Sequence, residues 1–232
     1  MGLRRRMLLA LAIGVAFAGV ASAASLGTVT SARLDGVVGT GPSGAKTVYA
    51  SDHFTGLAGT NLSGRPLVIG QTWVIGASTW LLSSANDVEV QKVVGGRAVT
   101  ATGQANVRIV LTVQDSGAGG RTTGVVLRSD ATAARYLSVY SLNGNGGKIT
   151  LAKRDGNTTA LTSFTGVNFT NPATWVVEVN GSNVRALYNG TEYINYTLTA
   201  ADQTMFGGLT SHGMLNDNSG VVRFDDFRVE SL

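Results

Sequence analysis

Aromatic, hydroxyl and guanidinium groups recur at two-residue spacing in the middle of this sequence, between Gly124 and Leu142. Successive side chains of a β-strand point to opposite faces, so groups two residues apart share a face. A tyrosine ring can stack on the face of a sugar, while arginine and serine donate hydrogen bonds to hydroxyl groups. The pattern therefore predicts a glycan-binding surface. Its candidate ligand-binding residues are Arg128, Tyr136, Ser138, Tyr140 and, on an earlier segment, Arg108.

The same side chains also suit a structural role, and the sequence leaves both interpretations open. A tyrosine on a half-buried strand packs its ring against its neighbours, and an arginine covers apolar surface with its aliphatic stem. The three tryptophans, Trp73, Trp80 and Trp175, are expected in the hydrophobic core, because large aromatic side chains dominate the cores of β-sandwiches.

Two apolar, β-branched segments must position the candidate residues. Gly124–Leu127 and Tyr136–Leu142 are separated by Ser129–Ala134, a polar stretch of small residues that suits the loop of an antiparallel hairpin. Alternation places Val125 and Leu127 on an apolar face, whereas the tyrosines lie on a mixed, polar face. This hairpin is expected to be the element around which the binding surface is organised.

The rest of the chain also follows the two-residue period of strands. Ala105–Gln114 alternates most clearly, and Gly95-Gly96 has the composition of a two-residue hairpin turn between strands at Asp87–Val94 and Arg97–Ala101. Helical periodicity is missing from the chain after residue 23, and Leu198–Met205 is expected to form at most one turn. Many short strands separated by glycine and asparagine turns predict an all-β fold, an antiparallel sandwich of two sheets.

The first 23 residues have the composition of a secretory signal peptide. Three arginines (Arg4–Arg6) precede an apolar run at Met7–Val20, and Ala21-Ser22-Ala23 has the small residues of a cleavage site. Residues 24–47 are rich in glycine, serine and threonine and are expected to form a flexible spacer before a folded domain at 48–232. The predicted location is outside the cell or on its surface. An uncleaved signal that remains as a membrane anchor is the alternative.

Charge and cysteine content exclude several partners. Without the three arginines of the predicted signal, 15 basic and 14 acidic residues remain, so the net charge is near zero. A nearly neutral protein lacks the excess positive charge that attracts nucleic acid or an anionic membrane. No stable membrane span is expected after signal cleavage. No cysteine is present to form a disulfide, so the hydrophobic core must stabilise the fold.

Several short motifs follow one another along the predicted domain. They are Asp52-x-Phe54, Trp73, Gly124-Val-Val-Leu-Arg128, Arg135-Tyr-Leu-Ser-Val-Tyr140, Thr174-Trp175-Val-Val-Glu-Val, Tyr188-Asn-Gly190 and Phe224-Asp-Asp-Phe-Arg-Val229. In this order they resemble the concanavalin A-like, laminin G-like jelly-roll family of secreted bacterial proteins, over about residues 51–232. The resemblance implies two stacked antiparallel sheets, one of them concave, with the first and last strands side by side. It implies less about activity, because this fold carries lectins, glucanases, lyases and adhesive spacers.

Glucanases of the family place three acids on one strand, and one segment of this chain is similar. Asp87, Glu89 and Gln91 share a face of the predicted strand, and the first two are close enough in sequence to form a carboxylate pair. The third position is an amide, and an amide cannot donate a proton as a carboxylic acid does. A solvated strand face is therefore the favoured interpretation of these residues.

The resemblance also implies a candidate calcium site where the first and last strands meet. Asp225 and Asp226 point to opposite faces of the last strand, and Asp52 is expected on its neighbour. Carboxylate oxygens, completed by backbone carbonyls, are the ligands that Ca²⁺ prefers. The alternative is that one aspartate caps a loop through backbone N–H groups while the other is solvated. No other cofactor is predicted.

These observations favour a secreted, non-catalytic module that binds carbohydrate or another cell-surface polymer. Two alternatives stay open. The first is a structural or adhesive surface protein, for instance an assembly subunit whose sheet edges or faces contact a protein partner. The second, more remote, is a glycoside hydrolase or a polysaccharide lyase.

Overall fold

The computed structural model of the protein describes residues 45–115, 121–143, 147–217 and 222–232. These residues form thirteen β-strands and one short α-helix. The first strands are β1 (Val48–Asp52), β2 (Val74–Leu82), β3 (Val88–Ala101), β4 (Val107–Asp115) and β5 (Arg121–Ser129). They are followed by β6 (Arg135–Asn143), β7 (Lys148–Asp155), β8 (Asn157–Thr165), β9 (Ala173–Asn180), β10 (Asn183–Tyr188) and β11 (Thr191–Thr197). Helix α1 (Ala200–Phe206), β12 (Ser211–Asn216) and β13 (Val222–Glu230) complete the fold.

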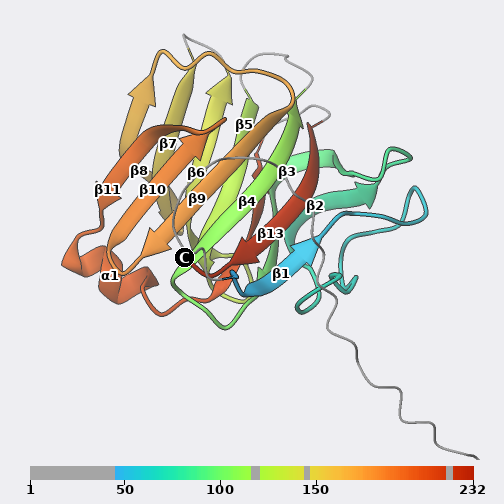
Figure 1. Cartoon of the computed structure of the whole chain (residues 1–232), viewed down its shortest axis with the longest axis horizontal. Helices are drawn as coiled ribbons and strands as arrows, with labels where there is room; N and C mark the ends of the chain where they lie inside the picture. Colours follow the sequence, from blue (N-terminus) through green and yellow to red (C-terminus); the bar gives the residue numbers. More distant parts are fainter. Residues whose placement is uncertain (1–44, 116–120, 144–146, 218–221) are drawn as a thin grey trace, which may run out of the picture. The chain divides into compact units, whose positions relative to one another are not determined.

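The strands form two stacked antiparallel layers, which confirms the predicted all-β, jelly-roll sandwich (Figure 1). The first sheet has the strand order β11-β10-β9-β4-β13, and β1 also pairs with β13. The second sheet has the order β3-β12-β5-β6-β7-β8, and β2 also pairs with β3. The first and last strands are neighbours, as the family resemblance implies, because Asp52 of β1 is opposite Phe227 of β13.

Strand β3 belongs to both sheets and joins them. Near its start, Val88 pairs with Phe224 of β13 in the first sheet, and from Gly96 onward β3 pairs with β12 in the second sheet. The prediction of a hairpin turn at Gly95-Gly96 is therefore wrong, because the chain bends here without reversing. Gly95 has a φ of +64°, which glycine adopts without steric cost, and this residue allows the strand to pass from one layer to the other.

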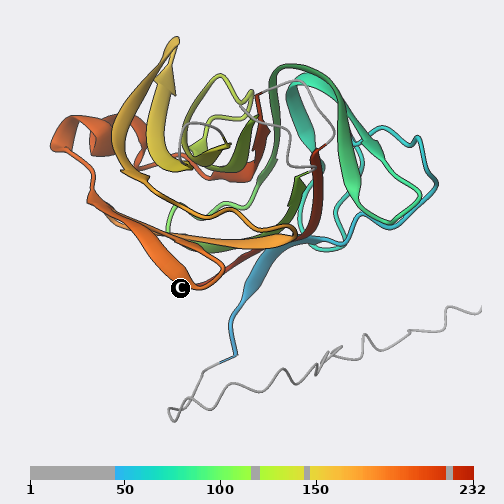
Figure 2. The ribbon, with the colours of Figure 1, turned by 90° about the horizontal axis from the view of Figure 1, so that it is seen from above.

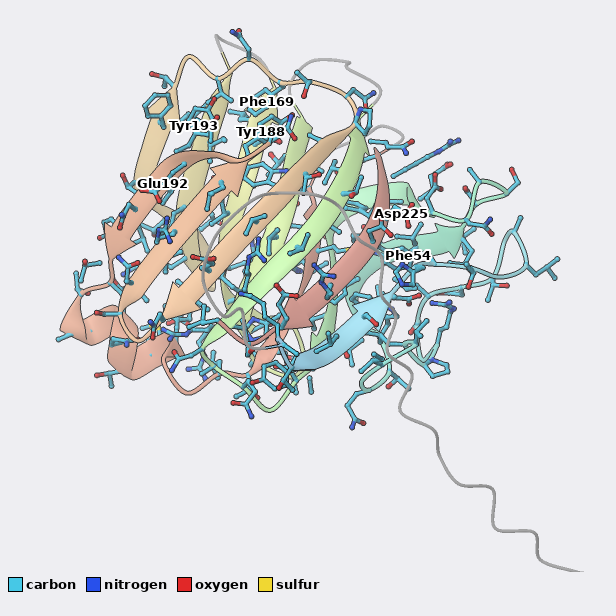
Figure 3. The ribbon with its side chains drawn as sticks, in the orientation of Figure 1. Phe54, Phe169, Tyr188, Glu192, Tyr193 and Asp225 are labelled. Atoms are coloured by element: carbon cyan, nitrogen blue, oxygen red, sulfur yellow. The ribbon has the colours of Figure 1, made fainter. Side chains whose placement is uncertain are left out.

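The hydrophobic core fills the space between the two sheets. Every second residue of β10 is buried, as expected for a strand with one face on the core. The predicted core positions of Trp73, Trp80 and Trp175 are confirmed, since each is at most 1% exposed. The ring of Trp175 contacts the ring of Tyr188 edge-to-face at a centroid distance of 5.2 Å, and Tyr188 contacts Phe169 in the same way at 5.3 Å (Figure 3).

The second sheet is curved, and its face directed away from the first sheet is concave. Figure 2 shows the sheet rising at both sides, with β7 and β8 in gold on one side and β2 and β3 in teal on the other. Only glycine fits at residue 124 of β5 in this sheet, because an added Cβ atom would lie 2.1 Å from the carbonyl oxygen of Val139 on β6. We refer to this surface as the concave face.

Helix α1 connects the two sheets near one end of the sandwich. It has seven residues, about two turns rather than the single turn predicted. The hydroxyl of Thr199 accepts a hydrogen bond from the backbone N–H of Asp202 at 3.2 Å and so caps the first turn. The ammonium group of Lys153 on β7 donates to the Asp202 carboxylate at 2.6 Å, which attaches the helix to the second sheet.

The two ends of the described domain lie side by side. The backbone N–H of Thr47 donates to the hydroxyl oxygen of Ser231 at 3.2 Å, and the ammonium group of Lys46 donates to the carbonyl oxygen of Ser231 at 3.3 Å. The predicted signal peptide, and the predicted spacer except for residues 45–47, lie outside the described residues. In the ranges that are described, no helix is long and apolar enough to span a membrane.

Candidate functional site

The predicted hairpin is formed by β5 and β6, and it directs three of the candidate residues to the concave face. Val125 of β5 is opposite Val139 of β6, and both side chains are fully buried in the core between the sheets. Tyr136, Ser138 and Tyr140 alternate with these core residues and therefore point the other way. The structure thus brings these three side chains together on one surface, as the spacing predicts.

Arg128 does not share that surface, which corrects the prediction. Its backbone has a φ of +47°, so the regular alternation of β5 ends here, and the side chain is 1% exposed. The guanidinium group is surrounded by neutral oxygen acceptors, with N···O distances of 2.6 to 3.1 Å. Those acceptors are the carbonyl oxygens of Ala105 and Gly181 and the side-chain amide oxygens of Asn106 and Gln203. Burial lowers the pKa of Arg128, and the residue joins the second sheet to loops of the first sheet and to α1.

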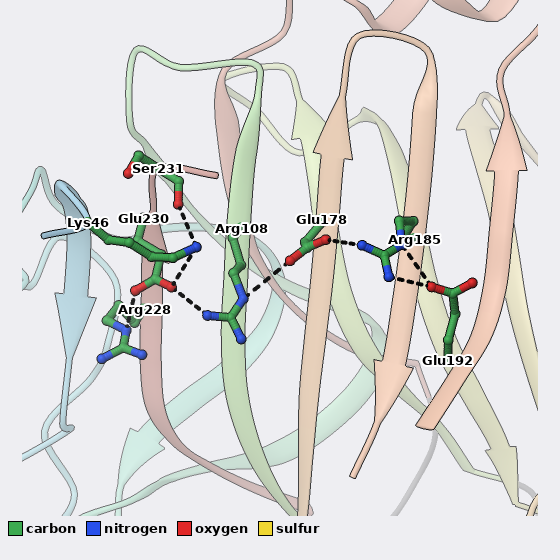
Figure 4. A network of polar contacts seen from close by, with 8 residues as sticks. All are labelled: Lys46, Arg108, Glu178, Arg185, Glu192, Arg228, Glu230 and Ser231. Carbon is green, nitrogen blue, oxygen red and sulfur yellow. Dashed lines mark hydrogen bonds and ion pairs between the residues drawn. The ribbon is translucent and has the colours of Figure 1, made fainter. Parts of the chain in front are cut away.

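Arg108 lies on the outer face of the first sheet, away from the concave face, so this second arginine is also misplaced in the prediction. Its guanidinium group is 2.8 Å from the Glu230 carboxylate on β13 and 3.5 Å from that of Glu178 on β9. Figure 4 shows that the row continues across β10 and β11, where Arg185 contacts both Glu178 at 2.9 Å and Glu192 at 2.6 Å. Opposite charges alternate along this row, so Arg108 is already paired on both sides.

Arg97 on β3, which the sequence analysis did not single out, is an arginine of the concave face. Arg97 belongs to a row of residues that crosses four neighbouring strands. The pairs in this row are Arg97 with Leu215 of β12, Leu215 with Gly124 of β5, and Gly124 with Tyr140 of β6. The Arg97 guanidinium donates to the hydroxyl oxygen of Tyr136 at 3.1 Å, and its carbon atom lies 5.4 Å from the centre of the Tyr136 ring. Its half-buried side chain therefore borders the tyrosines.

Tyr140 is the more accessible of the two tyrosines on this face, since it is half-buried whereas Tyr136 is 4% exposed. Burial raises the pKa of the Tyr140 hydroxyl, and the negative charge of Asp217 adds to this rise, while a hydrogen bond with Thr150 acts in the opposite direction. Asp217 follows β12 directly and is exposed. Tyr140 therefore keeps its proton at neutral pH and offers a ring and a hydroxyl next to an exposed carboxylate.

A second hydrophobic cluster fills the middle of the concave face, and we refer to it as the outer cluster. Its members are Val99, Val126, Ala133, Tyr136 and Leu215, and Tyr140 packs against it. These side chains are at most 4% exposed, so this part of the surface is not accessible to a ligand. The row formed by Arg97, Tyr140 and Asp217 and a pocket beyond Val99 are accessible parts of the concave face.

The loop between β5 and β6 covers the outer cluster and is organised by one carboxylate. Asp130 accepts hydrogen bonds of 3.0 Å from the backbone N–H groups of Thr132, Ala134 and Arg135. Burial by itself would raise the pKa of Asp130, but these hydrogen bonds outweigh it and lower the pKa below its ordinary value. The loop therefore has a defined shape, with Ala133 packed into the outer cluster.

Asp52, a candidate calcium ligand, is fully buried and its carboxylate has protein donors on both oxygens. One oxygen accepts a hydrogen bond from the backbone N–H of Phe54 at 2.9 Å. The other accepts from the indole N–H of Trp73 at 2.7 Å and from the guanidinium group of Arg65. Asp52 thus has the loop-capping role that was the alternative to calcium binding.

Asp225 and Asp226, the other two candidate calcium ligands, lie at a bulge of β13 (Figure 3). The Asp226 carboxylate is 3.1 Å from the imidazole of His53, and the Asp225 carboxylate accepts a hydrogen bond from the backbone N–H of Asp226 at 2.7 Å. Burial raises the pKa of Asp225, and the hydrogen bond from Asp226 partly offsets this rise. Within the described ranges, no three acidic, histidine or cysteine side chains are grouped so that they could hold a metal ion.

Both acids of the candidate pair at the start of β3 form ion pairs with one basic side chain. The guanidinium group of Arg223 on β13 lies 3.9 Å from the Asp87 carboxylate and 3.6 Å from the Glu89 carboxylate. Asp87 is 2% exposed and also accepts a hydrogen bond from the hydroxyl of Ser83. Both carboxylates therefore belong to a contact that holds β3 beside β13.

Comparison with solved structures shows the same fold in proteins of low sequence identity. The carbohydrate-binding module CBM66 from Bacillus subtilis is 11% identical, with 68% of this chain and 91% of that chain covered and a TM-score of 0.50. The GH43 protein BlXynB from Bacillus licheniformis is 16% identical, with coverage of 79% and 39% and a TM-score of 0.56. The catalytic domain of an endo-1,3-beta-glucanase from Thermotoga petrophila is 8% identical, with coverage of 81% and 98% and a TM-score of 0.52. No protein-family model and no curated protein sequence matches the chain.

Proposed function

We propose that this protein is an exported, non-catalytic carbohydrate-binding module of the concanavalin A-like class, and that it binds glycans at the accessible row of its concave face. The observation that carries the proposal is the position of Tyr140, a half-buried tyrosine that shares one face of a curved sheet with Arg97 and Asp217. An aromatic ring supplies a stacking surface, the guanidinium group supplies donors, and the carboxylate supplies acceptors for sugar hydroxyls. CBM66 from Bacillus subtilis, named as a carbohydrate-binding module, has the same fold and supports this proposal.

Replacing Tyr140 with alanine should weaken glycan binding by at least about tenfold, because a central aromatic contact is removed. Retention of the purified protein on a panel of insoluble polysaccharides and cell walls, and migration in gels that contain soluble polysaccharides, would measure this effect. Asp217→Asn should weaken binding to the same glycan, because it removes the negative charge and one acceptor oxygen.

The matched control is Tyr193→Ala. Tyr193 is also a half-buried tyrosine, but it lies on β11 of the first sheet, where its ring contacts Phe164 at 5.1 Å. Binding that is lost equally in both variants would contradict a site at Tyr140. Repeating the assay with EDTA tests the candidate calcium site, since a dependence on calcium would appear as lost retention.

Catalysis is tested with the same polysaccharide panel. The pairing of Asp87 and Glu89 with Arg223 supports a structural role for these acids, so we expect no release of reducing or unsaturated sugar. Release that is abolished by Glu89→Gln would contradict the non-catalytic part of the proposal.

A second candidate function, a subunit of a surface assembly, is favoured by one feature of the second sheet. Strand β8 is the last strand of that sheet, and in the described residues it pairs with β7 alone. None of its nine residues is charged, although edge strands usually carry charges that prevent pairing with another chain. Self-association through this edge would raise the mass measured by light scattering with concentration, and Ser163→Lys would abolish that rise.

A further inference from the structure

A pocket of about 500 Å³ lies at the end of the concave face, beyond the outer cluster. Its walls come from β1, the start of β2, the end of β3, the start of β12, the loops next to β2 and β3, and the loop between β5 and β6. The volume lies within the range of roughly 300 to 1,000 Å³ that is usual for small-ligand sites. The pocket belongs to neither the candidate calcium site nor the candidate acid pair.

Every residue that lines this pocket is uncharged. Hydroxyl and carboxamide groups come from Tyr49, Gln71, Thr72 and Ser211, on three different segments of the chain. Gln71 and Thr72 are exposed, so their side chains are free to reorient around a ligand. These groups can donate and accept hydrogen bonds, but they give no electrostatic attraction to a phosphate, a sulfate or a carboxylate.

The other part of the lining is apolar. Val74 of β2 is opposite Val99 of β3, and both border the pocket, together with Ala101 and Ala131. Tyr49 adds an aromatic ring that packs against the core on its other side. A surface that combines apolar patches, one aromatic ring and neutral hydrogen-bonding groups is complementary to a sugar ring, which has apolar C–H faces and a rim of hydroxyls.

The pocket is placed so that one glycan chain could reach it from the Tyr140 row. Val99 and Ala101 follow Arg97 on the same face of β3, about 7 and 13 Å further along the strand. The outer cluster lies between the two regions and excludes a ligand from the surface itself. A glycan that contacts both regions would therefore pass over the cluster.

We infer that this pocket is a second binding site, specific for an uncharged sugar residue. The inference rests on the proposed function, because it assigns one residue of the same ligand. A uronic acid is excluded from the pocket, since its carboxylate would lose water without gaining a cationic partner.

The test compares two tryptophan substitutions in one loop. Ala131 borders the pocket and Ala134 does not, and both side chains are exposed. Ala131→Trp should place an indole in the pocket and weaken binding of a neutral monosaccharide by at least about tenfold, whereas Ala134→Trp should change it less than about twofold. Binding is measured by titration calorimetry and NMR with glucose, galactose, mannose, xylose, arabinose and fructose, and with glucuronic and galacturonic acids as charged probes.

The possible outcomes distinguish a failure of the pocket site from a failure of the proposed function. Binding of a neutral sugar that is lost in Ala131→Trp and kept in Ala134→Trp supports the pocket site. Polysaccharide retention by the wild type without binding of any monosaccharide overturns the pocket site and leaves the proposed function intact. Equal binding of uronic acids, or binding that Ala131→Trp does not weaken, also overturns the inference. Absence of both monosaccharide and polysaccharide binding overturns the proposed function itself.

Discussion

Arg128→Met should lower the free energy of unfolding by about 4 kcal/mol and should leave no measurable change in glycan specificity. Methionine fills much of the space of the arginine stem but removes the guanidinium donor from four partly buried oxygen acceptors, of which, within the described part of the chain, only the Asn106 amide oxygen keeps another donor, the backbone N–H of Gly181. Each buried polar group that loses its partner costs roughly 1 to 3 kcal/mol. Urea denaturation, followed by tryptophan fluorescence, would measure the loss.

Arg108→Met is the matched control for this experiment. Arg108 also contacts several protein oxygens, but its side chain is 28% exposed, so water and salt screen its ion pairs. The control should lose no more than about 1 kcal/mol. If Arg128→Met were as stable as the control and bound glycan less well, the original prediction of a ligand-binding arginine would stand.

The protein should lose stability as the pH falls from about 6.5 to about 4, because His212 is buried in its neutral form. Burial lowers the pKa of His212 from 6.5 to about 4; the hydrogen bond to the carbonyl oxygen of Gln104 opposes this change, and the charge of Arg128 adds to it. In this pH window the unfolded chain binds a proton that the folded chain does not. The difference between 6.5 and about 4 corresponds to about 3 kcal/mol, all of which is available above pH 6.5 and lost progressively below it.

The hydrogen bonds of His212 explain why protonation is unfavourable. The Nδ1 atom accepts from the backbone N–H of Arg128 at 3.3 Å, and Nε2 lies 2.8 Å from the carbonyl oxygen of Gln104, which fits a proton on Nε2. A second proton on Nδ1 would face another N–H group. His212→Gln should therefore flatten the difference in unfolding free energy between pH 6.5 and 4, even if its stability at neutral pH is lower. An equal slope in both proteins would assign the pH dependence to other groups.

The periodicity of the sequence predicted the hairpin and the inward-facing residues correctly, because burial of one sheet face imposes a two-residue repeat. Val125 and Leu127 are in the core, and Tyr136 and Tyr140 are on the opposite face. The same rule misplaced Arg128, because the repeat holds only while the backbone stays extended, and the left-handed backbone at Arg128 rotates its side chain out of the pattern.

Arg97 was missed because the two preceding glycines resemble a hairpin turn. A Gly-Gly pair suits a reversal of the chain and a bend within a strand equally well, and only the partners on either side distinguish the two. The useful signal was the repeat of Arg97, Val99 and Ala101, which assigns all three to one face of a strand. The burial of Asp52 and the contacts of Arg223 join residues far apart in sequence, so local patterns could not predict them.

The position of the domain's ends determines how the concave face can be presented. The chain enters at β1 and leaves after β13, both in the first sheet, where Thr47 and Ser231 are hydrogen-bonded. Figure 2 shows the C-terminus on the side of the molecule opposite the concave face. A surface, a neighbouring domain or a purification tag attached at either end would therefore leave Tyr140 directed outward. Immobilisation through the ends is accordingly the orientation of choice for biosensor measurements on this protein.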